Sequence, residues 1–89
     1  MAKTQLTIIN KLGLHARAAA KLVSTATSFG SRISVSANGQ CVDGKSIMSV
    51  MMLAAAKGTD IEIECIGHDE QQALDALVTL INNRFDEAE

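Results

Sequence analysis

A histidine stands in this chain at the point where a strand pattern gives way to a helix pattern. Residues 4–9 are rich in β-branched side chains, Gly13 interrupts them, and strong helix formers follow from Ala16 onward. His15 therefore falls at or beside the N-cap of the predicted helix. A helix start leaves backbone N–H groups unpaired and carries the positive end of the helix dipole, so it favours an anion.

Arg17 adds a second cation to the first turn of the same predicted helix. An acidic residue is favoured there by about 0.3–1 kcal/mol, so a cation is unfavourable unless an anion neutralises it. We interpret His15 as an imidazole that accepts a phosphoryl group, with the guanidinium beside it. Three backbone N–H groups would bind the phosphoryl oxygens: those of Ala16, Arg17 and Ala18. A histidine that caps the helix without any chemistry is the alternative.

Length and composition limit what else the chain can be. It has 89 residues, two phenylalanines and no proline, tryptophan or tyrosine. We expect one domain over residues 1–89, with a core built from Ile, Leu, Val, Met and Ala. Without aromatic platforms for stacked bases, single-strand nucleic-acid binding is disfavoured. The sequence shows no signal-peptide pattern and no run of about 20 apolar residues, so we expect a cytoplasmic protein without a membrane span.

The two cysteines, Cys41 and Cys65, are not in a CxxC arrangement and both fall in strand-like segments. We expect both to be reduced and buried, rather than joined in a disulfide or bound to a metal. The sequence indicates no metal site and no cofactor.

The net charge of −2 conceals an uneven distribution. Residues 1–42 carry five basic residues and no acidic one, a charge of +5, whereas residues 43–89 carry ten acidic and three basic residues, a charge of −7. We expect a positive patch around His15 that attracts an acidic partner surface rather than DNA. Charges scattered over a solvated surface are the alternative.

Hydrophobic periodicity predicts the element order βαββαβα. Strands are expected over residues 4–9, 32–37, 40–42 and 60–65, and helices over residues 16–27, from 47 through 55 or 56, and from 70 to about 84. Asn38-Gly39 is typical of a two-residue hairpin turn. Because the strands are half polar and each helix has one apolar stripe, we expect an α+β fold. Its four-stranded antiparallel sheet would carry three helices on one face and be open to water on the other.

Polar residues mark the ends of the later helices. Ser46 is the expected N-cap of the second helix, and Asp69 with Gln72 has the form of a capping box at the third. Arg84 at the end of the third helix matches the helix dipole. The acidic residues 86–89 are expected to fray, and His68 is expected to be a solvated loop residue.

Residues 39–46 match the P-loop pattern G-x-x-x-x-G-K-[ST]. We reject nucleotide binding there, because residues 40–43 have the pattern of a strand leaving the hairpin. A phosphate cradle needs a free loop after a buried parallel strand. The chain is also too short for a nucleotide-binding array of strands and helices.

Two features of the second helix have a structural and a functional interpretation. Ser46 is explained by capping alone, worth about 1 kcal/mol. A phosphate on it would add nearly two negative charges to the surrounding surface and prevent partner docking. One face of this helix is predicted to carry Ile47, Val50, Met51 and Ala54. The other side or its rim is predicted to carry Met48, Met52 and Leu53. One interpretation of the methionines is that they pack in the core. The alternative is that they are exposed and form a pliable surface that binds differently shaped partners.

The sequence resembles the HPr family, the histidine-containing phosphocarriers of the phosphoenolpyruvate-dependent phosphotransferase system. The resemblance lies in Gly13-Leu14-His15-Ala16-Arg17, in Gly44-Lys45-Ser46-Ile47-Met48 and in the end of the third helix, and covers essentially the whole chain. It implies an open-faced β-sandwich with strand order 1-4-2-3, and a phosphoryl group carried on Nδ1 of His15. Arg17 would lie beside the phosphate. Ser46 would be the regulatory serine that a dedicated kinase phosphorylates in many members.

The resemblance also implies partners. Enzyme I would be the phosphoryl donor, and an enzyme IIA protein or domain the acceptor. Their shared docking surface would be the face around His15 and four residues of the second helix: Ile47, Met48, Met51 and Met52. We expect a monomer. One departure is Ala18, where the family usually has proline, because alanine restores an N–H donor and relaxes the turn.

We therefore expect a phosphocarrier that acts in sugar uptake or in its nitrogen-related branch, a carrier rather than a free-standing enzyme. His15 would be the nucleophile in loading and the leaving group in unloading. A regulatory adaptor of the same fold, switched by phosphorylation of Ser46, is the alternative. A small-molecule-binding regulatory α+β domain is a third possibility, but it leaves the pairing of His15 with Arg17 unexplained.

Overall fold

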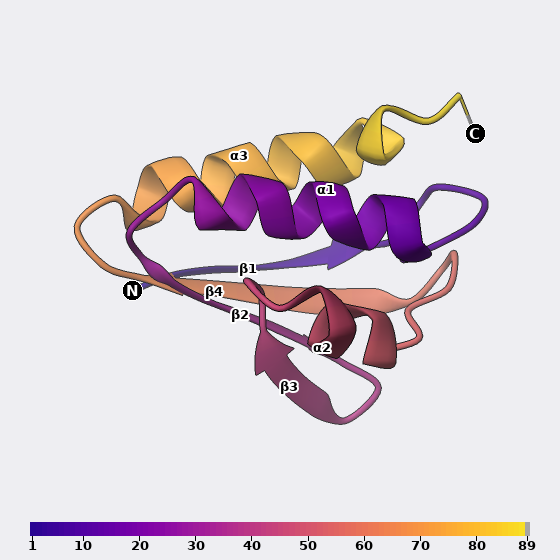
Figure 1. Ribbon diagram of the computed structural model, residues 1–89, viewed down its shortest axis with the longest axis horizontal. Helices are drawn as coiled ribbons and strands as arrows, with labels where there is room; N and C mark the ends of the chain where they lie inside the picture. Colours follow the sequence, from indigo (N-terminus) through magenta and orange to yellow (C-terminus); the bar gives the residue numbers. More distant parts are fainter. Residues whose placement is uncertain (89) are drawn as a thin grey trace.

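The computed structural model describes residues 1–88 and has its elements in the predicted order (Figure 1). The strands are β1 (Ala2–Thr7), β2 (Arg32–Ala37), β3 (Gln40–Asp43) and β4 (Asp60–Ile66). The helices are α1 (Ala16–Thr27), α2 (Ile47–Met52) and α3 (Glu70–Asn82), followed by the 3-10 turn η1 (Arg84–Asp86). All strand pairs are antiparallel in the order β1-β4-β2-β3, which confirms the predicted order 1-4-2-3.

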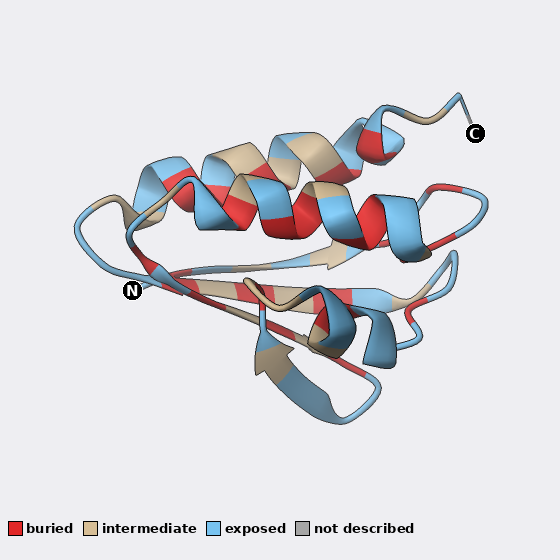
Figure 2. Ribbon diagram, in the orientation of Figure 1, coloured by how far each residue is buried: buried red, intermediate tan, exposed pale blue. Residues whose placement is uncertain are grey.

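The sheet has one apolar face and one polar face. Along β4, Ile61, Ile63 and Cys65 are buried, while Glu62 and Glu64 between them are only half-buried on the opposite face. Buried residues on the helices lie toward the sheet (Figure 2). α1 contacts both α2 and α3, and α3 also packs on β1 and β4. The arrangement confirms the predicted α+β open-faced sandwich.

α1 has the bounds that the sequence predicted. Its apolar stripe is buried against the core: Ala18, Ala19, Leu22, Val23 and Ala26. Complete burial of a side chain such as Leu22 contributes roughly 2 kcal/mol. This packing holds the start of α1 in place for the chemistry expected there.

The hairpin between β2 and β3 also follows the prediction. Asn38 and Gly39 have φ values of +53° and +80°, which a primed two-residue turn requires. Residues 40–43 form strand β3. The P-loop-like pattern therefore runs through a strand and is not a free phosphate-binding loop.

The first strand spans Ala2–Thr7 instead of the predicted residues 4–9. Its pairing with β4 ends at Thr7. Ile8 is fully buried, and its N–H donates to the carbonyl of Thr59, in the loop before β4, at 2.9 Å. The apolar pattern marked residues that enter the core, but the register with β4 decides where the strand ends.

α2 stops at Met52, short of the predicted end at residue 55 or 56. Ala54 takes a left-handed φ of +53°, and the carbonyl of Ala55 accepts a hydrogen bond from the N–H of Leu14 at 2.9 Å. Tertiary hydrogen bonding to the loop before α1 thus replaces the last predicted turn.

The predicted faces of the second helix are wrong in part. Val50 is buried as expected, but Leu53, predicted at the rim, is buried as well. Ile47, Met51 and Ala54, predicted to lie beside Val50, are exposed. Because α2 is only six residues long, it buries little more than Val50 and the residue that ends it.

Asp69 precedes α3, but among the described residues its side chain makes no capping hydrogen bond, so the predicted capping box with Gln72 is wrong. Its carboxylate accepts instead from the N–H groups of Gly30 and Ser31, at 2.9 and 3.0 Å, and from the Ser31 hydroxyl. These bonds, the one from the Ser31 hydroxyl foremost, lower the pKa of the Asp69 carboxyl. They tie the start of α3 to the loop between α1 and β2.

The C-terminal segment packs against the body of the protein, which corrects the expected fraying. Phe85 is fully buried and is the largest such side chain, although composition predicted a core without aromatic residues. Lys21 of α1 donates to the Phe85 carbonyl at 2.8 Å. Arg84 lies in η1 rather than in the last turn of α3. Glu89, the last residue of the predicted tail, lies outside the described residues.

The cysteines are both free, as predicted, but only one is buried. Burial raises the pKa of the Cys65 thiol. Cys41 is exposed, because it lies on β3 at the edge of the sheet. Within residues 1–88 no cluster of three or more His, Cys, Asp or Glu side chains is arranged to hold a metal ion. None of the helices in this range is long and apolar enough to cross a membrane.

Candidate functional site

His15 is the N-cap of α1, as the sequence predicted. Its backbone is extended, with φ −73° and ψ 177°, and its carbonyl accepts from the N–H of Ala19 at 2.8 Å. Its ring atom Nδ1 accepts from the N–H of Arg17 at 3.3 Å. The imidazole therefore occupies the position where a helix start binds an anion, and Nδ1 is the nitrogen nearest the first turn.

Gly13 fixes the loop that leads into His15. It has φ +67°, and a Cβ on it would lie 2.6 Å from the carbonyl oxygen of Ala55. That carbonyl also accepts from the N–H of Leu14. Only glycine, which has no Cβ, allows the loop to lie this close to the segment after α2. His15 therefore lies where that segment meets the start of α1.

Glu87 reaches the His15 ring from the other end of the chain. One carboxylate oxygen contacts Nε2 of His15, and the other accepts from Nδ2 of Asn10 at 2.9 Å. Hydrogen bonding by Asn10 and then by His15, together with the positive charge of Arg17, lowers the pKa of the Glu87 carboxyl. Glu87 is therefore part of the site, which the sequence analysis missed.

Asn10 was missed as well. Its side chain is fully buried, and Nδ2 also donates to the carbonyl of Gly13 at 2.8 Å. Asn10 therefore links the loop before His15 to the C-terminal segment. Its contact with Glu87 joins residues 77 positions apart, so periodicity and short motifs carry no signal of it.

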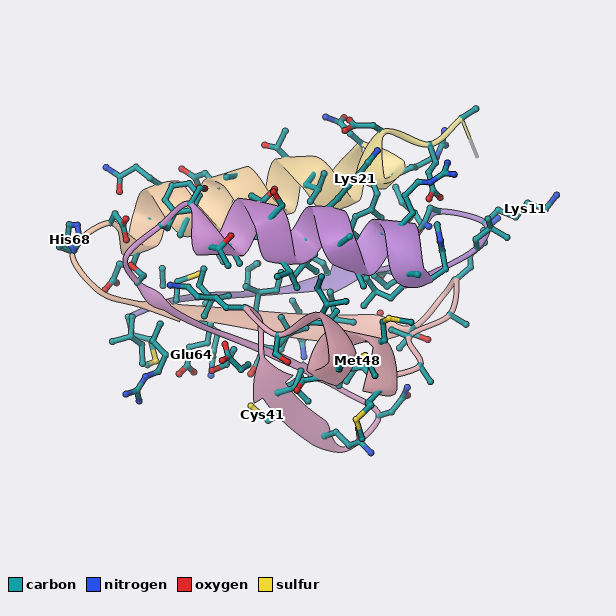
Figure 3. All side chains as sticks on the ribbon, viewed as in Figure 1. Lys11, Lys21, Cys41, Met48, Glu64 and His68 are labelled. Atoms are coloured by element: carbon teal, nitrogen blue, oxygen red, sulfur yellow. The ribbon has the colours of Figure 1, made fainter. Side chains whose placement is uncertain are left out.

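An open pocket beside the ring brings charges of both signs together. Three basic side chains and two acidic ones line it with His15: Lys11, Arg17, Lys21, Asp86 and Glu87. Lys11 extends from this end of the molecule, and Lys21 lies on α1 near the C-terminal segment (Figure 3). Lys11, Arg17 and Lys21 supply the positive charges of the patch that the sequence predicted around His15. The acidic half of the chain adds two carboxylates, which the sequence analysis did not place there.

Ser46 and the methionines lie on the helix that packs beside α1. Ser46 is the N-cap of α2, and its hydroxyl accepts from the N–H of Ser49 at 3.4 Å, as predicted for a cap. Met48 and Met52 are each 70% exposed, and Figure 3 shows Met48 on α2. Leu12 is 67% exposed and lines a shallow pocket together with His15 and the segment after α2. Leu12, which the sequence analysis did not select, extends the apolar surface of α2 to the ring.

The chain is similar to known proteins over its whole length. A family model described as the PTS HPr component phosphorylation site matches residues 2–83. The phosphocarrier protein HPr of Pseudomonas aeruginosa is 59% identical over 90 residues, covering 100% of both chains. The crystal structure of HPr-C-His from Thermoanaerobacter tengcongensis has a TM-score of 0.96 at 42% identity, covering 100% of each chain. The crystal structure of Crh from Bacillus subtilis, described as a domain-swapped dimer, has a TM-score of 0.74 at 36% identity, covering 93% of this chain and 95% of that one.

Proposed function

Because the chain belongs to the HPr family, the phosphocarriers of the phosphotransferase system, we propose that His15 carries the phosphoryl group on Nδ1. The observation that supports this assignment is the position of Nδ1 at the start of α1, 3.3 Å from the N–H of Arg17. The ring is 28% exposed, so a donor can reach it while its orientation stays defined.

Loading forms one bond and breaks one. The lone pair of Nδ1 attacks the phosphorus, and the bond from phosphorus to the donor breaks with its electron pair remaining on the donor. The N–H groups of Ala16, Arg17 and Ala18 and the Arg17 guanidinium stabilise the phosphoryl oxygens. A protein catalyses phosphoryl transfer mainly by positioning the reacting groups and by stabilising the charge on the transferring phosphoryl oxygens. Unloading is the same reaction in reverse toward an acceptor.

Family membership implies interaction with enzymes of the phosphotransferase system. We propose enzyme I as the donor and an enzyme IIA protein or domain as the acceptor. The docking surface comprises the His15 pocket and the exposed apolar side chains of α2: Ile47, Met48, Met51 and Met52. Flexible thioethers adapt to differently shaped partners, which suits a surface that meets a donor and an acceptor in turn. We propose that the protein acts as a monomer, because a dimer through this surface would cover it.

We propose that Ser46 is a regulatory phosphorylation site for a serine kinase. Its position as N-cap of α2 lets the helix tolerate a phosphate. The same phosphate would place nearly two negative charges on the docking surface and weaken binding to an acidic partner. The family match and the HPr names of the relatives do not favour the alternative of a pure regulatory adaptor.

Incubation with phosphoenolpyruvate and a catalytic amount of enzyme I tests the carrier function. We expect one acid-labile phosphate on Nδ1 of His15, seen by ³¹P NMR, that disappears when an enzyme IIA is added. His15→Asn retains a good N-cap residue and should abolish labelling. His68→Asn, at an exposed histidine outside the site, is the matched control and should be labelled like the wild type. Absence of labelling in the wild type, or a label on another residue, would refute the assignment.

A further inference from the structure

The contacts of the His15 ring define which of its nitrogens bears the proton. A carboxylate only accepts hydrogen bonds, so the contact with Glu87 places a proton on Nε2. On the other side of the ring, the N–H of Arg17 donates to Nδ1, which must therefore carry a free lone pair. Two separate contacts, one to each nitrogen, thus specify the same neutral tautomer.

Glu87 is held firmly enough to maintain this assignment. Its second carboxylate oxygen accepts from Nδ2 of Asn10, whose other amide proton goes to the carbonyl of Gly13. Both neighbours of Nδ2 are acceptors, so the orientation of the Asn10 amide is determined. The Glu87 side chain is only 15% exposed. The carboxylate is therefore part of a partly buried chain of hydrogen bonds and not a loose surface partner.

We propose that Glu87 is a positioning residue for phosphoryl transfer at His15, an inference that rests on the proposed function. It keeps the proton on Nε2 and so presents the lone pair of Nδ1 to the phosphorus of the donor. When the N–P bond forms and the bond to the donor breaks, the ring retains its Nε2 proton and becomes positively charged. The Glu87 carboxylate, already in contact with that proton, stabilises the charge.

The same contact assists release of the phosphoryl group. As long as Nε2 keeps its proton, the departing ring takes the electron pair of the N–P bond onto Nδ1 and leaves as a neutral imidazole. Without that proton the leaving group would be an imidazolate anion, which is a much poorer one. Glu87 therefore keeps the group transferable in both directions, which a carrier requires.

Obstruction of the site by Glu87 is the competing explanation for the contact. The contact is to Nε2, however, and Nδ1 is the nitrogen at the start of α1. A carboxylate that kept the phosphoryl group out would lie at Nδ1, where it would compete with the N–H of Arg17. The geometry therefore favours support of the ring.

The substitution Glu87→Gln separates the two explanations. It keeps the shape of the side chain but supplies an amide that can also donate to Nε2, so only the long contact from the Arg17 N–H to Nδ1, at 3.3 Å, still favours the Nε2–H tautomer. We expect ¹⁵N NMR of the ring to show the Nε2–H tautomer in the wild type and a mixture in the variant. The rate of phosphoryl acceptance from phosphorylated enzyme I should fall about 10- to 100-fold. Glu87→Ala should give the same loss in rate.

Glu64→Gln is the matched control, because it makes the same substitution at a carboxylate on the open face of β4, away from the residues that line the His15 pocket. We expect its ring spectrum and its acceptance rate to equal those of the wild type. Thermal unfolding of all three variants verifies that they are folded.

Three outcomes for Glu87→Gln would overturn the inference. An unchanged ring spectrum would mean that Glu87 does not set the tautomer, and a changed spectrum with an unchanged rate would mean that the tautomer does not matter for transfer. A faster rate would mean that Glu87 obstructs the site. The ring spectrum is recorded without any phosphoryl donor, so it decides the position of the proton even if the wild type accepts no phosphate. If the wild type accepts no phosphate, the proposed function is refuted, and the inference about the ring proton is tested separately by the spectrum.

Discussion

The two ends of the molecule each place a histidine beside a carboxylate at a helix start, yet we propose phosphoryl transfer at only one of them. His15 and Glu87 meet at the start of α1, and His68 and Asp69 precede α3 at the opposite end, where Figure 3 labels His68. His68 is 84% exposed, and its Nε2 is 4.0 Å from the Asp69 carboxylate. At one end the carboxylate orients the ring, whereas at the other it holds a backbone loop and leaves the ring in water.

The two helix starts also differ in charge. The first turn of α3 contains Glu70, and the N-terminal amine of Met1, 2.6 Å from its carboxylate, holds the pKa of that carboxyl low. The first turn of α1 contains no acidic residue and carries Arg17. Since an acid in the first turn neutralises the helix dipole, α3 has no need of an external anion and α1 does. The phosphoryl site that we propose is therefore at the helix start whose first turn contains no acidic residue.

The largest effect should come from the cation at the start of α1. We expect Arg17→Ala to lower the rate of phosphoryl acceptance from phosphorylated enzyme I about 100-fold, because one charged donor to the transferring group is lost. Arg32→Ala removes an exposed arginine on β2 and should leave the rate unchanged. Equal rates for the two variants in single-turnover assays would contradict the role of Arg17.

Giving α1 the charge pattern of α3 should cost function and add stability. In Ala16→Glu an acid enters the first turn, as Glu70 does in α3, and we expect acceptance to slow about 10-fold because the helix start is neutralised. The free energy of unfolding should rise by about 0.3–1 kcal/mol. Ala20→Glu, also exposed but one turn later, serves as the control in the same denaturation and transfer assays. A variant that is more stable and equally active would break the comparison.

At the α3 end we expect an effect on stability alone. The pKa of Asp69 is lowered in the folded protein, so its ionised form stabilises the fold above its unfolded pKa of about 3.9. That contribution is lost as the pH falls through the lower folded pKa. Asp69→Asn should therefore be less stable than the wild type at pH 7, with a gap that narrows below about pH 4.

Denaturant unfolding at pH 7 and pH 3 measures this gap, with Asp75→Asn, at an exposed acid of α3, as the control. Phosphoryl acceptance should be unchanged in both variants. A stability gap that stays constant with pH would show that the ionised Asp69 carboxylate does not hold the loop.

The smallest effect should follow from Ala18→Pro, which introduces the residue that the resemblance to the HPr family led us to expect at this position. Ala18 lies in the first turn of α1, where a proline ring is tolerated because the N–H it removes has no partner within the helix. We expect the free energy of unfolding to change by no more than about 1 kcal/mol, mainly through the entropy of the unfolded chain. Acceptance should fall only a few-fold, because the proposed Ala18 N–H donor is lost while those of Ala16 and Arg17 and the Arg17 guanidinium remain. A large loss of stability or of the acceptance rate would mean that the buried first turn of α1 has no room for a proline ring at position 18.

Local patterns predicted the parts of the molecule that depend on near neighbours. The bounds of α1, the hairpin at Asn38 and Gly39, and the N-cap roles of His15 and Ser46 were all predicted correctly. Each depends on conformational preferences of a few adjacent residues or on a repeat of 2.0 or 3.6 residues. The end of α2 and the partner of Asp69 were predicted wrongly, because hydrogen bonds from distant segments outweighed the local preference.

The amino-acid sequence by itself determined the helix start, the histidine that caps it and the cation beside that histidine, since these lie within three consecutive positions. Only the tertiary structure decided which groups surround the ring of that histidine. Glu87 is 72 positions from His15 in the chain, and Asn10 aligns it through a buried amide. The ring nitrogen that carries a proton depends on which groups surround it in space, and folding alone brings those groups together.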